Sequence, residues 1–217
     1  ASSDLVLIAV LALGIFPPLM ASMSLADSLA QIGTIVGDIS KVLDLPDQRR
    51  STTKADLSGS RIELAGVRFS YGDEEVIHGI DLSIEPGSMV ALVGPSGSGK
   101  STLGRLLAGF WDADAGTVSI GGVPLEDMTP DQQAGLIAYV SQDNYLFDET
   151  IMDNIRMGRP GASDEEVVAI AEASGCDEFI RGLDEGYRTR VGGAGGHLSG
   201  GERQRIAIAR AMLKDAP

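Results

Sequence analysis

A glycine-rich loop constrains the fold of this chain more than any other feature of the sequence. The loop consists of Gly94, Pro95, Ser96, Gly97, Ser98, Gly99, Lys100, Ser101 and Thr102. It follows the apolar run 89–93, which we expect to be a strand, and it opens a helical pattern over 103–107. In that setting the spacing G-x-x-x-x-G-K-[ST] is typical of a loop whose backbone N–H groups surround a polyphosphate at the positive end of a helix.

Two side chains of this loop have predicted roles in nucleotide binding. Lys100 is expected to contact the β- and γ-phosphates, and the hydroxyl of Ser101 is expected to hold Mg²⁺. The loop therefore predicts a site for a magnesium nucleotide.

A second glycine-rich turn precedes a helical pattern near the end of the sequence. Ser199, Gly200, Gly201 and Glu202 follow Leu198 and lead into a stretch without glycine or proline. Ser199 and Glu202 have the spacing of a capping box, which predicts a helix start with free N–H donors. Taken alone, the motif favours an ordinary capped helix after a glycine loop. One compact phosphate tail would not need a second anion site so far along one subunit.

Four motifs in this order make the segment 61–217 resemble the ATP-binding cassette (ABC) family. The turn 198–202 resembles the family signature, with Glu202 where glutamine is commoner. Gln142 resembles the glutamine of the Q-loop, and Tyr71 resembles the aromatic residue that stacks on adenine. The resemblance implies an α/β P-loop NTPase fold with an antiparallel β subdomain and a helical subdomain that carries the signature.

The resemblance also implies how ATP is bound. In this family two such domains dimerise head to tail, and each ATP lies between the phosphate loop of one subunit and the signature of the other. Ser199, Gly200, Gly201 and Glu202 would then contact ATP in trans. Lys100 and Gln142 would be catalytic, with Gln142 sensing Mg²⁺ and the attacking water.

Periodic patterns predict the elements around these motifs. Alternating residues indicate strands at 61–70 and 76–85 around a turn at Gly72 and Asp73, and a short strand at 117–120. Helical patterns cover 165–174 and 177–183 after an acidic start. The stretch 145–155 resembles the place where the coupling helices of an exporter's membrane domain dock, although core packing explains Leu146 and Ile155 equally well.

An uncharged stretch from Leu5 to Ala26 precedes the ATPase-like segment. It is long enough to cross a bilayer, which takes about 20 residues. Pro17 and Pro18 are expected to kink or interrupt the helix. A signal peptide would need a basic leading segment, and a buried soluble helix would usually be shorter and amphipathic. We therefore predict a membrane span.

The order of segments suggests a transporter with fused domains. We predict the end of a transmembrane domain at 1–45, including an amphipathic extension, then a polar linker at 46–60 and the nucleotide-binding domain at 61–217. Exporters of the ABC family have this order on one polypeptide. The resemblance thus favours an exporter-type half-transporter in the plasma (inner) membrane, with its nucleotide-binding domain in the cytoplasm. The family's Walker B strand and catalytic glutamate would follow position 217, so the chain is expected to be an internal piece of a longer transporter.

Composition limits the partners. The net charge of −14 and the pI near 4.4 argue against nucleic acid. Cys176 is the single cysteine, which excludes an intrachain disulfide and fits a reducing compartment. The expected partners are a second half-transporter, identical or different, the membrane and a transported solute. Two alternatives stay open, a soluble or importer-type ABC ATPase subunit and a nucleotide-binding regulatory module without a competent catalytic centre.

Overall fold

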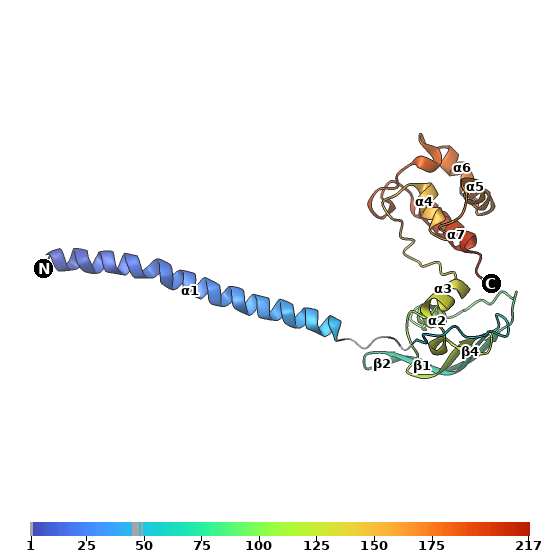
Figure 1. Ribbon diagram of the computed structural model, residues 1–217, viewed down its shortest axis with the longest axis horizontal. Helices are drawn as coiled ribbons and strands as arrows, with labels where there is room; N and C mark the ends of the chain where they lie inside the picture. The colour runs from blue at the N-terminus through green and yellow to red at the C-terminus, as the bar shows by residue number, and fades with distance from the viewer. Residues whose placement is uncertain (1, 45–47, 49) are drawn as a thin grey trace. The chain divides into compact units, whose positions relative to one another are not determined.

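The computed structural model describes residues 2–44, 48 and 50–217, apart from some side chains of the first helix and that of Ala194 (Figure 1). The chain divides into two units, 1–48 and 49–217. The predicted start of the linker at 46 lies outside the described residues. Segment 50–58, also predicted as linker, belongs to the second unit and is hydrogen-bonded to other parts of it. Arg50 pairs with Asp112 at 2.8 Å, and Ser58 donates to the carbonyl oxygen of Gly121 at 2.7 Å.

The first unit contains the helix α1, Ser2–Leu43. The expectation is that Pro17 and Pro18 kink or interrupt the helix. The backbone stays helical at both positions, so an interruption is wrong, and a kink stays a prediction. Each proline removes one N–H donor and crowds the carbonyl oxygen four positions earlier, which strains the helix without ending it here. Among the described residues, no helix is long and apolar enough to cross a membrane. The span predicted at Leu5–Ala26 is therefore not found, and several of its side chains lie outside the described set.

The second unit begins with an antiparallel sheet of order β2-β1-β3-β4. Strand β1 (Ile62–Tyr71) pairs with β2 (Glu74–Ile84) across the turn at Gly72, whose φ of 61° favours glycine. On its other side β1 pairs with β3 (Ala115–Ile120), which continues into β4 (Val123–Pro124). The predicted hairpin and the predicted third strand are both confirmed.

Three helical segments accompany this sheet. They are α2 (Lys100–Leu107), the short η1 (Leu125–Asp127) and α3 (Pro130–Leu136). Apolar side chains of the strands, of α2 and of the segment 125–128 form one buried core, composed of Leu64, Val67, Phe69, Ile77, Leu103, Leu106, Val118, Ile120, Leu125 and Met128. The core fixes the start of α2 against β2, which is where the phosphate loop ends.

The apolar run 89–93 is not a strand, in contrast to the prediction. Its backbone has no regular structure, and Met89 and Val93 are 98% and 92% exposed. A strand is stable only beside a hydrogen-bonded neighbour, and within the described part of the chain no strand pairs with this run. Local pattern therefore marks the run as apolar but does not by itself make it part of a sheet.

After an irregular segment that follows α3, the remainder of the second unit is mostly helical (Figure 1). It comprises α4 (Ile151–Arg156), α5 (Asp164–Ala173), α6 (Asp177–Arg181), η2 (Gly186–Arg188), η3 (Gly193–Gly195) and α7 (Gly200–Lys214). These helices share a second buried core, composed of Leu146, Ile151, Ile155, Ala162, Val167, Ala171, Cys176, Ile180, Val191, Leu198, Ile206, Ala209 and Leu213. The predicted helices at 165–174 and 177–183 are confirmed, with the second ending two residues early.

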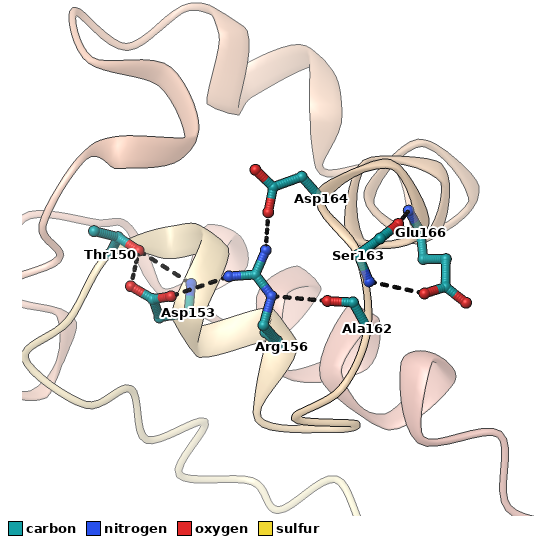
Figure 2. A network of polar contacts seen from close by, with 7 residues as sticks. All are labelled: Thr150, Asp153, Arg156, Ala162, Ser163, Asp164 and Glu166. Carbon is teal, nitrogen blue, oxygen red and sulfur yellow. Dashed lines mark hydrogen bonds and ion pairs between the residues drawn. The ribbon is translucent and has the colours of Figure 1, made fainter.

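Polar contacts hold α4 against the start of α5 (Figure 2). The guanidinium of Arg156 lies between Asp153 and Asp164 and also donates to the carbonyl oxygen of Ala162 at 3.1 Å. Ser163 and Glu166 form a capping box at the first turn of α5, with Glu166 accepting from the Ser163 N–H at 2.8 Å. This scaffold supports the helical part that carries the signature.

Candidate functional site

The phosphate loop joins segment 89–93 to α2, and its shape requires glycine. Gly97 and Gly99 have φ of 81° and 82°, which L side chains rarely adopt. A Cβ on Gly94 would lie 2.8 Å from Ser98 Oγ, and one on Gly99 would lie 2.7 Å from Ile77 Cδ1. The loop thus forms a cradle that added side chains would fill. Residues 96–102 and Val76 line a hollow of about 310 Å³ there.

The end of the loop leaves the first turn of α2 open to a ligand. Gly99 is the N-cap residue and has no side chain that could cap the helix. The N–H groups of the first turn and the positive end of the helix dipole therefore favour an anion at this position. The polyphosphate site expected at this helix start stays a prediction.

Lys100 is folded over the loop. Its ammonium donates to the carbonyl oxygens of Gly94 and Pro95 at 2.9 and 2.6 Å and to Ser98 Oγ at 3.3 Å. All three acceptors are uncharged, so phosphate oxygens at the loop would compete for the ammonium with stronger, charge-assisted hydrogen bonds. The lysine is thus placed to bind an anion held by the loop.

Tyr71 ends β1 beside the last residue of the loop. Its hydroxyl lies 3.4 Å from Thr102 Oγ1 and 3.5 Å from Arg105 Nη1, and these two groups lower the pKa of Tyr71. Its ring packs edge-on against Phe69 and Trp111, with centroids 4.9 and 6.0 Å away. Tyr71 as a whole is 40% exposed. Trp111 was not predicted as part of this group; its only sequence signal is its place shortly after α2.

The signature turn has the predicted capping box. Ser199 Oγ accepts from the N–H of Glu202 at 3.3 Å, and Glu202 Oε2 accepts from the N–H of Ser199 at 2.7 Å. The hydrogen bond from the Ser199 backbone lowers the pKa of Glu202. Gly200 and Gly201 are exposed, and Leu198 is buried beneath the turn. The turn therefore presents a helix N-terminus to the outside of the helical part.

Gln142 lies in the irregular segment between α3 and α4, and its side chain is exposed. Its carbonyl oxygen accepts from the Asn144 side chain at 3.1 Å. No hydrogen bond in the described part of the chain joins Gln142 or Ser199 to the phosphate loop. The structure thus brings Tyr71 to the loop but leaves the role of Gln142 a prediction.

The donor chemistry is compatible with Mg²⁺ bound together with a nucleotide. The Ser101 hydroxyl and the Gln142 amide supply neutral oxygens of the kind that Mg²⁺ accepts beside phosphate oxygens and water. Among the described residues no group of three or more His, Cys, Asp or Glu side chains could hold a metal ion.

Comparisons with known proteins agree on the family. The family model described as ABC transporter matches residues 77–217. The chain is 41% identical over 202 residues to a mycobactin import ATP-binding/permease protein of Mycolicibacterium thermoresistibile, covering 92% of this chain and 35% of that protein. It is 42% identical over 208 residues to an ATP-dependent lipid A-core flippase of Chromobacterium violaceum, covering 94% of this chain and 36% of that protein.

A solved structure shows the same fold. It is that of a bacterial Atm1-family ABC exporter with ATP bound, with a TM-score of 0.78 and 38% sequence identity. The match covers 86% of this chain and 34% of that one. The chain thus spans about a third of the length of these relatives.

Proposed function

Since the chain belongs to the ABC transporter family, we propose that it is the ATP-binding and ATP-hydrolysing part of an exporter-type half-transporter. The observation that supports this most directly is the presence of two separate glycine-rich helix starts, at α2 and α7, on different parts of one chain. A head-to-tail dimer uses both at once, because each nucleotide then meets one loop and the partner's signature.

In the proposed site the protein binds and orients ATP. The loop N–H groups and Lys100 hold the β- and γ-phosphates, Tyr71 stacks on adenine, and Ser199 with Gly201 of the opposite subunit contacts the γ-phosphate. Mg²⁺, held by Ser101 and Gln142, would neutralise charge on the phosphates. Most of the rate enhancement comes from positioning and charge stabilisation rather than covalent chemistry.

Membrane coupling is the second part of the proposal. Two relatives described above are named as an ATP-binding/permease protein and a flippase, and the similar structure is that of an exporter. We infer that nucleotide-driven closure and release of the dimer move attached membrane domains in the plasma (inner) membrane. One of these relatives is named for import. The proposal of export therefore rests on the exporter-type order of the segments and not on the names of the relatives.

A mixed-dimer experiment tests the composite site. In a full-length homodimeric transporter, one Lys100→Ala subunit is paired with one Ser199→Ala subunit, so that one site carries both lesions and the other carries neither. Each single-mutant homodimer has both sites damaged. We expect the mixed dimer to regain part of the ATPase activity. Activity no higher than in the single-mutant homodimers would contradict the trans arrangement.

Extraction with alkaline carbonate separates this proposal from a soluble or importer-type ATPase subunit. The full-length exporter should stay in the membrane pellet, whereas a peripheral subunit would be released. A regulatory module would bind nucleotide without hydrolysing it. Measurable ATP hydrolysis by the full-length protein would therefore distinguish the proposed ATPase from such a module.

A further inference from the structure

Arg210 is a half-buried cation on α7 whose role the proposed site does not explain. Its Nε donates to the carbonyl oxygen of Asn154 at 2.9 Å, its Nη2 to Asn154 Oδ1 at 3.0 Å and its Nη1 to the carbonyl oxygen of Tyr145 at 3.2 Å. All three acceptors are uncharged, and burial lowers the pKa of Arg210. Burying a charge on neutral oxygens costs free energy that an apolar side chain would avoid. Packing alone therefore gives no reason for an arginine here.

Asn154, the main partner of Arg210, is fully buried in α4. Its amide oxygen accepts from the Phe147 N–H at 2.9 Å, and its amide nitrogen donates to the Phe147 carbonyl oxygen at 2.9 Å and to that of Thr150 at 3.0 Å. The Asn154 side chain thus holds the backbone of Phe147 from both sides. The same amide oxygen receives Arg210, which joins this clamp to α7.

The clamped segment 145–147 follows the turn that carries Gln142. It has no regular secondary structure, so its position depends on these side-chain hydrogen bonds. Leu146 is fully buried, while the rings of Tyr145 and Phe147 are exposed and lie 5.3 Å apart. Tyr145, whose carbonyl oxygen Arg210 holds, is three positions after Gln142 and one after Asn144, which bonds the Gln142 carbonyl oxygen. A short series of contacts therefore leads from α7 to Gln142.

We propose that Arg210 is a positioning residue that couples the signature helix α7 to the Gln142 turn. The proposal rests on the function proposed above, in which Ser199 at the start of α7 meets the nucleotide of the opposite subunit. A shift of α7 on nucleotide binding would then move the Tyr145 carbonyl and, with it, Gln142. Arginine suits this task because its planar fork reaches all three oxygens at once, which the single ammonium of lysine does not.

The test compares Arg210→Met with Arg205→Met in the full-length transporter. Both remove an arginine from α7, but Arg205 lies over the Phe179 ring at 5.0 Å and so contacts another part of the helical core. Two quantities are measured, the kcat and KM of MgATP hydrolysis and the hydrogen exchange of backbone amides with and without a non-hydrolysable ATP analogue. For Arg210→Met we expect KM within about twofold and kcat lower by about tenfold to a hundredfold, the range that misplacement of a catalytic group produces.

Hydrogen exchange distinguishes coupling from stability. We expect the nucleotide-dependent change at 145–149 to disappear in Arg210→Met while the change at 199–202 persists, and both changes to persist in Arg205→Met. If Arg210→Met does not fold, Arg210→Lys takes its place and should show the same loss, because one ammonium cannot reach all three oxygens. An unaltered change at 145–149 together with an unaltered kcat would overturn the coupling. If the wild type shows no nucleotide-dependent change at 199–202, the proposed function itself fails.

Discussion

Replacing Ser199 with alanine separates what the signature does for the fold from what it does for the nucleotide. The substitution removes the Oγ that accepts from the Glu202 N–H at 3.3 Å, whereas the bond from the Ser199 N–H to the Glu202 carboxylate at 2.7 Å survives. Loss of a serine N-cap costs about 1 kcal/mol of stability. If Ser199 also contacts the γ-phosphate in trans, a further charge-assisted hydrogen bond of about 1.5–3 kcal/mol is lost.

Ser163 provides a matched control. It caps α5 through the same pair of hydrogen bonds, 3.3 Å from the Glu166 N–H to its Oγ and 2.8 Å from its own N–H to Glu166. Ser163→Ala should therefore cost the same stability, measured by equilibrium urea unfolding. A second measurement is the concentration of a non-hydrolysable ATP analogue at which half of the full-length dimers are closed. Ser163→Ala should not change this concentration.

For Ser199→Ala that concentration should rise at least about tenfold, because 1.4 kcal/mol corresponds to a factor of ten. Equal shifts in the two variants would refute the reasoning, since the effect would then come from helix capping alone. No shift in either would show that the Ser199 hydroxyl does not meet the nucleotide.

Three further predictions concern the loop, the aromatic residue and the cysteine. Lys100→Ala should weaken MgATP binding at least about tenfold, because charge-assisted hydrogen bonds are lost. Substitution of the exposed Lys54 by alanine is the control and should leave the affinity unchanged, as measured by calorimetry on the full-length protein. Equal affinities in the two variants would show that Lys100 does not bind the nucleotide. Tyr71→Ala should weaken the binding of ATP by about 1–3 kcal/mol if the ring stacks on adenine. Tyr71→Phe should bind ATP nearly as well as the unchanged protein, because the hydroxyl contacts at 3.4 and 3.5 Å are long. Equal losses of affinity in both variants would show that the hydroxyl, not the ring, is responsible. Burial raises the pKa of Cys176, so its thiolate forms only at a higher pH than in a free cysteine. In the native protein the thiol should therefore resist iodoacetamide at pH 8, and in urea it should react. Rapid reaction without urea would show that the thiol is accessible.

Local patterns predicted the helix starts because capping depends on residues a few positions apart. Ser199 and Glu202 are three positions apart, and their reciprocal hydrogen bonds form wherever the chain turns into a helix. Gly97 and Gly99 of the loop are equally local, since their positive φ angles are needed whatever surrounds them. The hairpin at Gly72 follows the same logic.

The apolar run 89–93 shows where local pattern is not sufficient. Its composition suits a buried strand, but a strand exists only through hydrogen bonds to a neighbour, which its own sequence does not supply. Pro17 and Pro18 likewise do not interrupt α1, because a helix of this length keeps most of its hydrogen bonds when two donors are lost.

The sequence by itself determined the family, the phosphate loop, the signature and the order of the elements, because each depends on residue type at short spacing. Tertiary structure alone decided which distant residues meet. Thr102 and Arg105 lie beside Tyr71 because α2 packs on the sheet, and Arg210 reaches Tyr145 and Asn154 across 65 and 56 positions of chain. No spacing rule connects such residues, since their contact follows from the packing of whole helices and strands around the two cores.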